Sequence, residues 1–261
     1  MLPMQILPCK RFYKVDIRAF TEDEKTSTWS LISKIWHVAT IKMSSSPYVK
    51  CRIETFCRVP DDNTMQQSEK SLWSTLAMIN DDITLLIDDN GQPMEIINYT
   101  ELQKKAHAAF AFIRERFDGD LIEKLLADAE TVYNDASLLL FELNTYKQFG
   151  LLTPCLYNND LNIITRDKIV YLQDATCKAD VEERFTRKDA EDMLHFSMKG
   201  RVKNQKEILT KIDTYVGEFV IEAETCSIHK ASVEIAYSMP DYKKIRTYVL
   251  QELSASDMEY L

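Results

Sequence analysis

The sequence predicts an α+β protein in which two antiparallel β units flank a central helical hairpin. Three observations predict this class. Apolar and polar residues alternate in the first part of the chain, as in half-buried strands. Apolar residues then recur every three or four positions between about residues 100 and 146, as in helices. Alternation returns after residue 160. We therefore expect an N-terminal unit at 1–147 and a C-terminal β-rich unit at 148–261, either separate or joined in one continuous domain.

The N-terminal strands are predicted at residues 12–20, 27–43 and 49–59. The first and third alternate cleanly between apolar and polar residues, while the second is rich in β-branched and aromatic residues. The polar run 21–25 separates the first two as a turn. A short amphipathic helix follows, with Leu72, Trp73, Leu76 and Ile79 on its apolar side.

The strongest local signal is a β-hairpin followed directly by helix. Asn90 and Gly91 lie between two alternating apolar runs, which is the sequence typical of a tight hairpin turn. Helical spacing begins at Thr100, and Gly119 ends this first helix. A second helix is expected over 120–146, where apolar residues follow a 3, 4, 3, 4 spacing. The two helices form the predicted hairpin.

The C-terminal unit begins after a predicted hinge at 148–159. Short strands are expected at 161–164 and 169–172, paired across a turn at 165–168. Alternation then predicts strands near 177–185 and 194–199, followed by a helical turn at 204–212. Three further strands are expected, at 215–227, 231–239 and 242–253.

Composition limits the classes of function. The chain of 261 residues has a formal net charge of -9, which disfavours nucleic acid as the main partner, because phosphate binding depends on Lys and Arg. No stretch approaches the roughly 20 apolar residues that span a bilayer. The first ten residues contain two prolines and resemble no secretory signal. We expect a cytoplasmic protein that binds neither nucleic acid nor membrane.

The sequence contains no pattern typical of a catalytic, cofactor or metal site. The five glycines are isolated, so neither a Walker loop nor a dinucleotide fingerprint is present. The six cysteines form no Cys-x-x-Cys pair, and we expect free thiols. The closest candidate metal motif, Cys226 with His229, lacks the further ligands that zinc needs. His195 is the candidate general base, but no partnered serine accompanies it. We therefore expect no enzyme, no cofactor and no metal.

Adjacent carboxylates are frequent, and they could bind a metal or act in glycoside hydrolysis. They fall at predicted turns and strand ends, where solvated acids are common, so we expect surface positions for them. These pairs are Asp61-Asp62, Asp81-Asp82, Asp88-Asp89 and Glu182-Glu183.

Aromatic side chains give the remaining candidate surface. They could line an apolar ligand site or a partner surface, although core packing is the favoured role for most of them. The candidates are Trp29, Trp36, Phe56, Trp73, Tyr237 and Tyr242.

Three functions remain open at this point. The favoured hypothesis is a non-enzymatic interaction protein (an adaptor, chaperone or inhibitor) that binds a protein through its acidic surface or a sheet edge. The second is a carrier of an apolar small molecule between a curved sheet and the helices. The third is an enzyme with a dispersed site, which would require His195 or His229 in a buried cluster with carboxylates.

Overall fold

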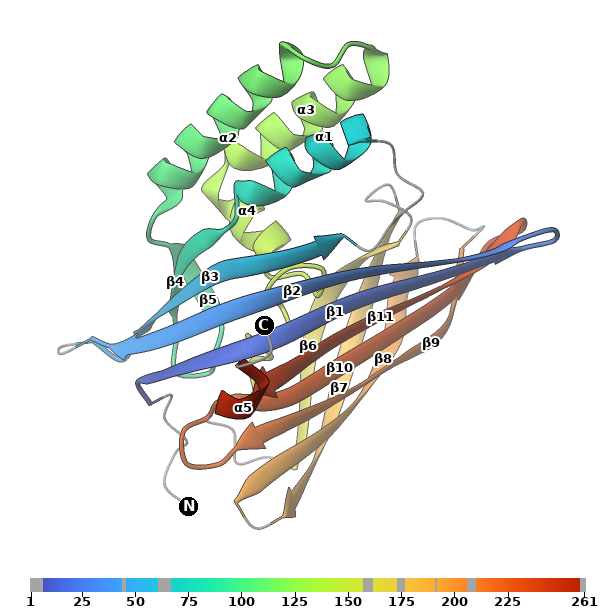
Figure 1. The fold of residues 1–261 in the computed structure, drawn as a ribbon. Helices are drawn as coiled ribbons and strands as arrows, with labels where there is room; N and C mark the ends of the chain where they lie inside the picture. Colours follow the sequence, from blue (N-terminus) through green and yellow to red (C-terminus); the bar gives the residue numbers. More distant parts are fainter. Residues whose placement is uncertain are drawn as a thin grey trace.

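The computed structural model describes residues 7–43, 46–60, 67–156, 162–172, 177–190, 192–205 and 210–258. The described strands form one antiparallel sheet of eleven strands, in the order β5-β4-β3-β2-β1-β11-β10-β9-β8-β7-β6 (Figure 1). The predicted α+β class, with two β units flanking a helical hairpin, is therefore wrong. The first and last strands of the chain pair over their length, from Phe12 with Leu253 to Asp23 with Tyr242, and this pairing joins both halves in one sheet.

Each strand of the sheet hydrogen-bonds to its neighbours in antiparallel register. The strands are β1 (Cys9–Asp23), β2 (Ser27–Lys42), β3 (Val49–Pro60), β4 (Asp82–Ile87), β5 (Pro93–Ile96), β6 (Ile163–Leu172), β7 (Cys177–Ala190), β8 (Met193–Gln205), β9 (Lys211–Glu222), β10 (Ile228–Ser238) and β11 (Tyr242–Leu253). Every pair of neighbouring strands except β1 with β11 is also consecutive in the sequence, so the pairing is mostly local.

Four of the five described helices lie together near one end of the sheet rather than between two β units, and the fifth, which follows β11, contacts that central strand. They are α1 (Gln67–Met78), α2 (Tyr99–Arg114), α3 (Asp120–Tyr133), α4 (Ala136–Leu143) and the short α5 (Ala255–Met258). In Figure 1, α1, α2 and α3 stack above the β3–β5 end, and α4 leads back toward the sheet. Helices α2 and α3 do form a hairpin, with Gly119 at its turn in the left-handed region (φ 122°).

The local predictions succeeded where one periodicity dominates. The Asn90-Gly91 hairpin is confirmed: β4 and β5 pair in antiparallel register, and Gly91 has φ 87°. The single helix expected over 120–146 was wrong. It ends at Tyr133, and Asp135 caps a new helix by accepting hydrogen bonds from the N–H groups of Ser137 and Leu138. The helical turn expected at 204–212 lies partly outside the described residues, but Lys211 and Ile212 belong to β9.

The hairpin expected across 165–168 was also wrong. Residues 163–172 form the single strand β6, which pairs with β7 without a register shift. The run of polar residues that favours a turn in the sequence therefore lies within an edge strand.

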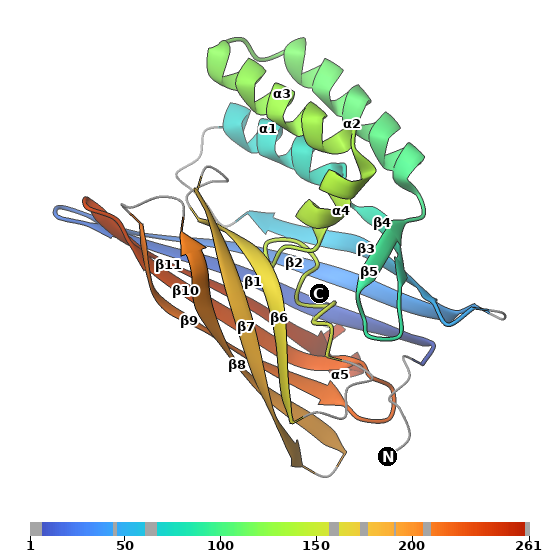
Figure 2. The ribbon, with the colours of Figure 1, turned by 180° about the vertical axis from the view of Figure 1, so that it is seen from behind.

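An irregular stretch at 144–156, which we call the inner segment, covers the concave face of the sheet (Figure 2). Its apolar side chains are buried against central strands: the ring centroids of Phe149 and Trp36 on β2 are 4.9 Å apart, and those of Tyr146 and Tyr248 on β11 are 6.1 Å apart. Because these contacts join distant parts of the chain, the inner segment is a central part of the core.

We predict that Phe149→Ala lowers the free energy of unfolding by about 3–5 kcal/mol, because it leaves a cavity beside Trp36 in the core. Urea denaturation monitored by tryptophan fluorescence measures the change. Leu121→Ala, at a position 80% exposed on α3, is the control and should shift stability by no more than about 0.5 kcal/mol. Equal effects of the two substitutions would contradict the central role of the inner segment.

Candidate functional site: a cavity at the free edge of the sheet

A charged residue occupies one position in the buried row of β7. Ala179, Val181 and Phe185 point into the core, and Glu183, at the same alternation, is also fully buried. The prediction that Glu182-Glu183 is a surface pair was therefore wrong for Glu183. Of these two residues, Glu182 is the one that is partly exposed, on the opposite face of the strand.

The Glu183 carboxylate is compensated by groups from three other elements. Arg166 on β6 donates from Nε to Oε2 at 2.5 Å. Tyr146 on the inner segment donates its hydroxyl to Oε1 at 2.7 Å, and Tyr215 on β9 donates to the same oxygen. Arg166 also donates to the Tyr146 hydroxyl oxygen at 2.9 Å and to the carbonyl oxygen of Pro154. The buried charge thus has both a counter-ion and hydrogen bonds, as its burial requires.

A glycine allows Tyr215 to reach Glu183 across the intervening strand. Gly200 on β8 pairs with Glu183, and Tyr215 lies one residue beyond the last β8–β9 pair, Lys199 with Val216. A Cβ atom on Gly200 would lie 2.0 Å from the Tyr215 ring, so only glycine leaves room for the ring over the β8 backbone.

These contacts change the acidities of the groups involved. Burial by itself would raise the pKa of Glu183, but Arg166, Lys168 and the two tyrosine hydroxyls outweigh it and hold the pKa below its usual value. Burial and the nearby carboxylate raise the pKa values of Tyr146 and Tyr215 well above their usual range. At neutral pH the cluster therefore contains an ionised Glu183 between neutral tyrosines and a charged arginine.

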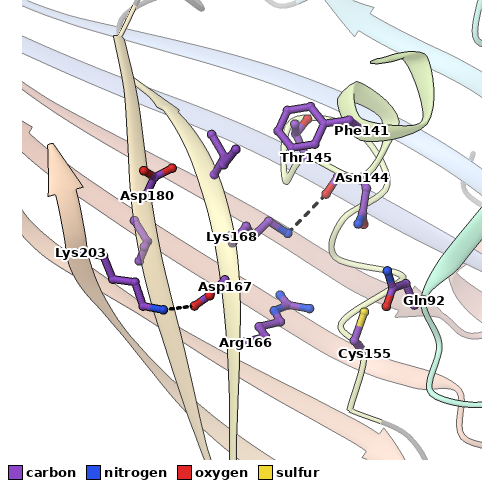
Figure 3. Close-up of a pocket in the computed structure, with 12 residues that line it drawn as sticks. Gln92, Phe141, Asn144, Thr145, Cys155, Arg166, Asp167, Lys168, Asp180 and Lys203 are labelled. Carbon is purple, nitrogen blue, oxygen red and sulfur yellow. Dashed lines mark hydrogen bonds and ion pairs between the residues drawn. The ribbon is translucent and has the colours of Figure 1, made fainter. Parts of the chain in front are cut away.

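A cavity of about 640 Å³ lies beside this cluster (Figure 3). One wall comes from β6, with contributions from β7 and β8, and the other from the end of α4, the inner segment and the turn that contains Gln92. Eight of the twelve lining residues are polar or charged, and three are apolar: Phe141, Ile169 and Val181. The size is typical of a ligand site, but the lining is not that of an apolar cavity.

The cavity borders the free edge of β6, which is the last strand of the sheet. The N–H group of Arg187 donates to the carbonyl oxygen of Asn162, so the backbone of Asn162 points toward β7. Because backbone direction alternates in an antiparallel ladder, the N–H and C=O groups of Thr165, Asp167 and Ile169 point away from β7. Among the described residues, no backbone hydrogen bond from another segment satisfies these groups.

The six aromatic candidates do not form one surface. Trp36 and Tyr237 are buried in the core, and Tyr242 packs partly against it. Trp29, Phe56 and Trp73 are exposed by 73%, 64% and 48%, but they lie on β2, β3 and α1. The Trp29 ring lies tilted against that of Phe20, and the Phe56 ring lies near that of Phe12, so the exposed rings belong to separate small clusters.

The histidine and cysteine candidates also lie apart from the cavity, except for Cys155. His195 is exposed on β8, and His229, about half exposed, contacts Glu252 at 3.3 Å. Neither lies in the buried cluster that the enzyme hypothesis requires. Within the described ranges, no three His, Cys, Asp or Glu side chains come together as metal ligands do. Cys9, Cys51 and Cys226 line a separate cavity of about 50 Å³, and the side chains of Cys57 and Cys177 lie outside the description.

Sequence reasoning missed the residues that make this site, but one signal was available. Glu183 interrupts an otherwise apolar row on β7, and a charge at a buried position of a strand requires a partner. On β6, Arg166 and Lys168 lie two residues apart, so they share one face of the strand and both point inward. Their partners Tyr146 and Tyr215 have no spacing relation to either strand, so only the fold identifies them.

Comparisons with known proteins assign no family. No family model matches the chain, and no curated protein matches it. Among solved structures, Rv2717c from M. tuberculosis is 6% identical, with 92% of this chain and 91% of that chain covered and a TM-score of 0.28. A putative outer membrane lipoprotein-sorting protein domain from Vibrio parahaemolyticus is 8% identical, with coverages of 96% and 90% and a TM-score of 0.16. The COG4313 outer membrane channel from Pseudomonas putida F1 is 5% identical, with coverages of 96% and 98% and a TM-score of 0.19.

Because these TM-scores are all low, the similarities carry no argument about function. No helix among the described residues has the length and hydropathy of a membrane span.

We predict that Glu183→Gln lowers the free energy of unfolding by about 3–5 kcal/mol at neutral pH, because Arg166 loses its buried counter-ion. The lowered pKa of Glu183 stabilises the fold above the unfolded pKa of about 4.3, and this contribution disappears as the pH falls through the folded pKa. The difference between wild type and variant should therefore shrink in acid. Urea denaturation across a pH series measures it, with the exposed Glu218→Gln as control. A difference that stays constant with pH would contradict the ionised state.

Proposed function

We propose that the protein is a non-enzymatic binding protein that pairs the free edge of β6 with an extended segment of another protein. The observation that carries the proposal is the juxtaposition of an edge strand of ten residues with a cavity of about 640 Å³ on its unpaired side. An added strand would satisfy the N–H and C=O groups of Thr165, Asp167 and Ile169.

The features of β6 support recognition rather than protection of this edge. Edge strands are commonly shielded by proline, by a bulge, by a covering segment or by charged side chains, and of these devices β6 itself carries the charges of Arg166, Asp167 and Lys168. Strand β6 contains no proline and pairs with β7 without a register shift. The inner segment approaches β6 through contacts with its side chains, such as Arg166 with Pro154 and Lys168 with Asn144, and no backbone hydrogen bond joins the two segments among the residues that the structure describes.

The several contacts that hold Arg166 in the cavity wall support the same proposal. Arg166 is held by Glu183, Tyr146 and Pro154, and its guanidinium lies 5.0 Å from the centre of the Phe185 ring. A wall whose side chains are already ordered lowers the entropic cost of binding. By contrast, the polar lining gives little support to the alternative of an apolar carrier.

The proposal predicts that proline at an edge position abolishes binding without unfolding the protein. Ile169→Pro removes an N–H group that faces the cavity, and proline is tolerated on an edge strand at such positions. Linear peptides of about nine residues, selected by phage display against the full chain, are the probes. We expect Ile169→Pro to weaken their binding by at least about tenfold, because a backbone hydrogen bond is lost and the added strand meets the proline ring.

Ile169→Ala is the matched control, since it removes the side chain but keeps the N–H group, and it should weaken binding by no more than about threefold. Circular dichroism of both variants checks that the fold is retained. Hydrogen exchange should show new protection at Thr165, Asp167 and Ile169 in the complex. A failure to select any peptide, or peptides that bind Ile169→Pro and wild type equally, would overturn the proposal.

A further inference from the structure

The three cations that line the cavity differ in their partners. Arg166 is paired with Glu183. Lys203 on β8 contacts Asp167 at 2.5 Å and Glu182 at 3.7 Å. Lys168 forms no ion pair with any described carboxylate, and its Nζ donates to the carbonyl oxygen of Asn144 at 3.3 Å. Among the described residues, Lys168 is therefore the cation of this cavity that forms no ion pair, although the Glu183 carboxylate lies near enough to raise its pKa.

The ammonium group of Lys168 is held in a defined place at the cavity wall. It lies 3.9 Å from the centre of the Tyr146 ring, and Figure 3 shows it extending from β6 toward the inner segment. An ammonium has three N–H donors, and the bond to Asn144 uses one of them. Two donors are thus left without a described protein acceptor.

The surroundings of Lys168 disfavour its charge. Burial lowers the pKa of Lys168 to about 8, and Arg166 lowers it too, while Glu183 and Cys155 act in the opposite direction. The titratable groups that face it are Arg166 on β6, Glu183 on β7, and Tyr146 and Cys155 on the inner segment. Burial raises the pKa of both Tyr146 and Cys155, so near neutral pH neither supplies a negative charge. A carboxylate from a partner beside Lys168 would stabilise the charged form of its ammonium group.

We infer that the segment which pairs with β6 carries an acidic side chain toward the concave face, and that Lys168 binds its carboxylate. This inference rests on the proposed function. Side chains of an added strand alternate between the two faces. Those on the concave face meet Lys168 and Arg166, and those on the opposite face meet Ile169, which is 38% exposed. The partner segment therefore combines an acidic residue with apolar or β-branched residues at alternate positions.

A second copy of the chain fits this edge poorly. Antiparallel pairing of two β6 strands would bring Arg166 and Lys168 of both copies to one face of the joined sheet, where like charges on neighbouring strands repel. The ammonium of Lys168, which forms no ion pair among the described residues, instead favours a segment that brings a carboxylate to this edge.

The test repeats the phage selection of random linear peptides at neutral pH on the wild-type chain and on Lys168→Gln. We expect peptides selected on the wild type to contain an Asp or Glu at a fixed position between β-branched residues, and this enrichment to disappear with Lys168→Gln. Each selected peptide is then compared with its synthetic Glu-to-Gln counterpart by calorimetry. Either change alone, the Glu-to-Gln change in the peptide or Lys168→Gln in the protein, should weaken binding by about tenfold or more. The two changes combined should weaken binding little more than either one does, because both remove the same ion pair.

Dependence on pH separates ion pairing from a merely structural role of Lys168. Binding of the acidic peptide should be constant below about pH 8 and should weaken by up to about tenfold per pH unit above it, because the free ammonium deprotonates. Lys168→Arg should restore binding and remove this decline, since arginine stays charged. The Gln peptide should show no decline on the wild type.

The outcomes distinguish this inference from the proposed function. Peptides that are sensitive to Ile169→Pro but have no acidic preference, or that are unaffected by Lys168→Gln, would overturn the inference and leave edge pairing intact. Peptides insensitive to Ile169→Pro would overturn the pairing itself. Displacement of the peptide by millimolar acetate, with acetate binding alone in a Lys168-dependent way, would assign the site to a small organic acid and overturn the inference. Dimers of the chain that form only through β6 would also overturn the inference.

Discussion

Glu183 carries a negative charge inside the protein, and the arrangement of four elements follows from the need to compensate it. Removing a carboxylate from water is costly unless a cation and hydrogen-bond donors replace the solvent. Here the cation comes from β6, and the donors come from the inner segment and from β9. A strand at the edge, an interior strand and an irregular segment are thereby tied to one residue of β7.

This compensation also determines the chemistry of the cavity. Arg166 is neutralised by Glu183, but Lys168, two residues further along the same strand, has no such partner among the described residues. The inner segment contacts both side chains yet does not pair with the β6 backbone. Among the described residues, the result is an edge whose outward backbone groups are unpaired, beside the ammonium of Lys168, which forms no ion pair, and the guanidinium of Arg166, which several contacts hold. We propose on these grounds that an extended, acidic segment pairs with this edge.

Much of the local structure was predictable because single periodicities dominate. The Asn90-Gly91 hairpin, helix α2 and the inward row of Leu194, Phe196 and Met198 follow from period and turn chemistry alone. The candidate site was not predictable in the same way. The polar run at 165–168 favours a turn, yet it is the part of β6 that carries Arg166 and Lys168. The residues that make the site are thus the ones that obscured the strand, because local sequence rules fail where a buried charge is compensated from elsewhere.

The sequence by itself determined which segments alternate, which are helical and where tight turns occur, because these depend on neighbouring residues. It also determined that the five glycines are isolated and that the six cysteines form no Cys-x-x-Cys pair. Only the tertiary structure decided that β1 pairs with β11, that residues 144–156 fill the concave face, and that β5 and β6 are the edges. The reason is physical: strand pairing and charge compensation join residues far apart in the chain, and no local pattern encodes which distant partner is chosen.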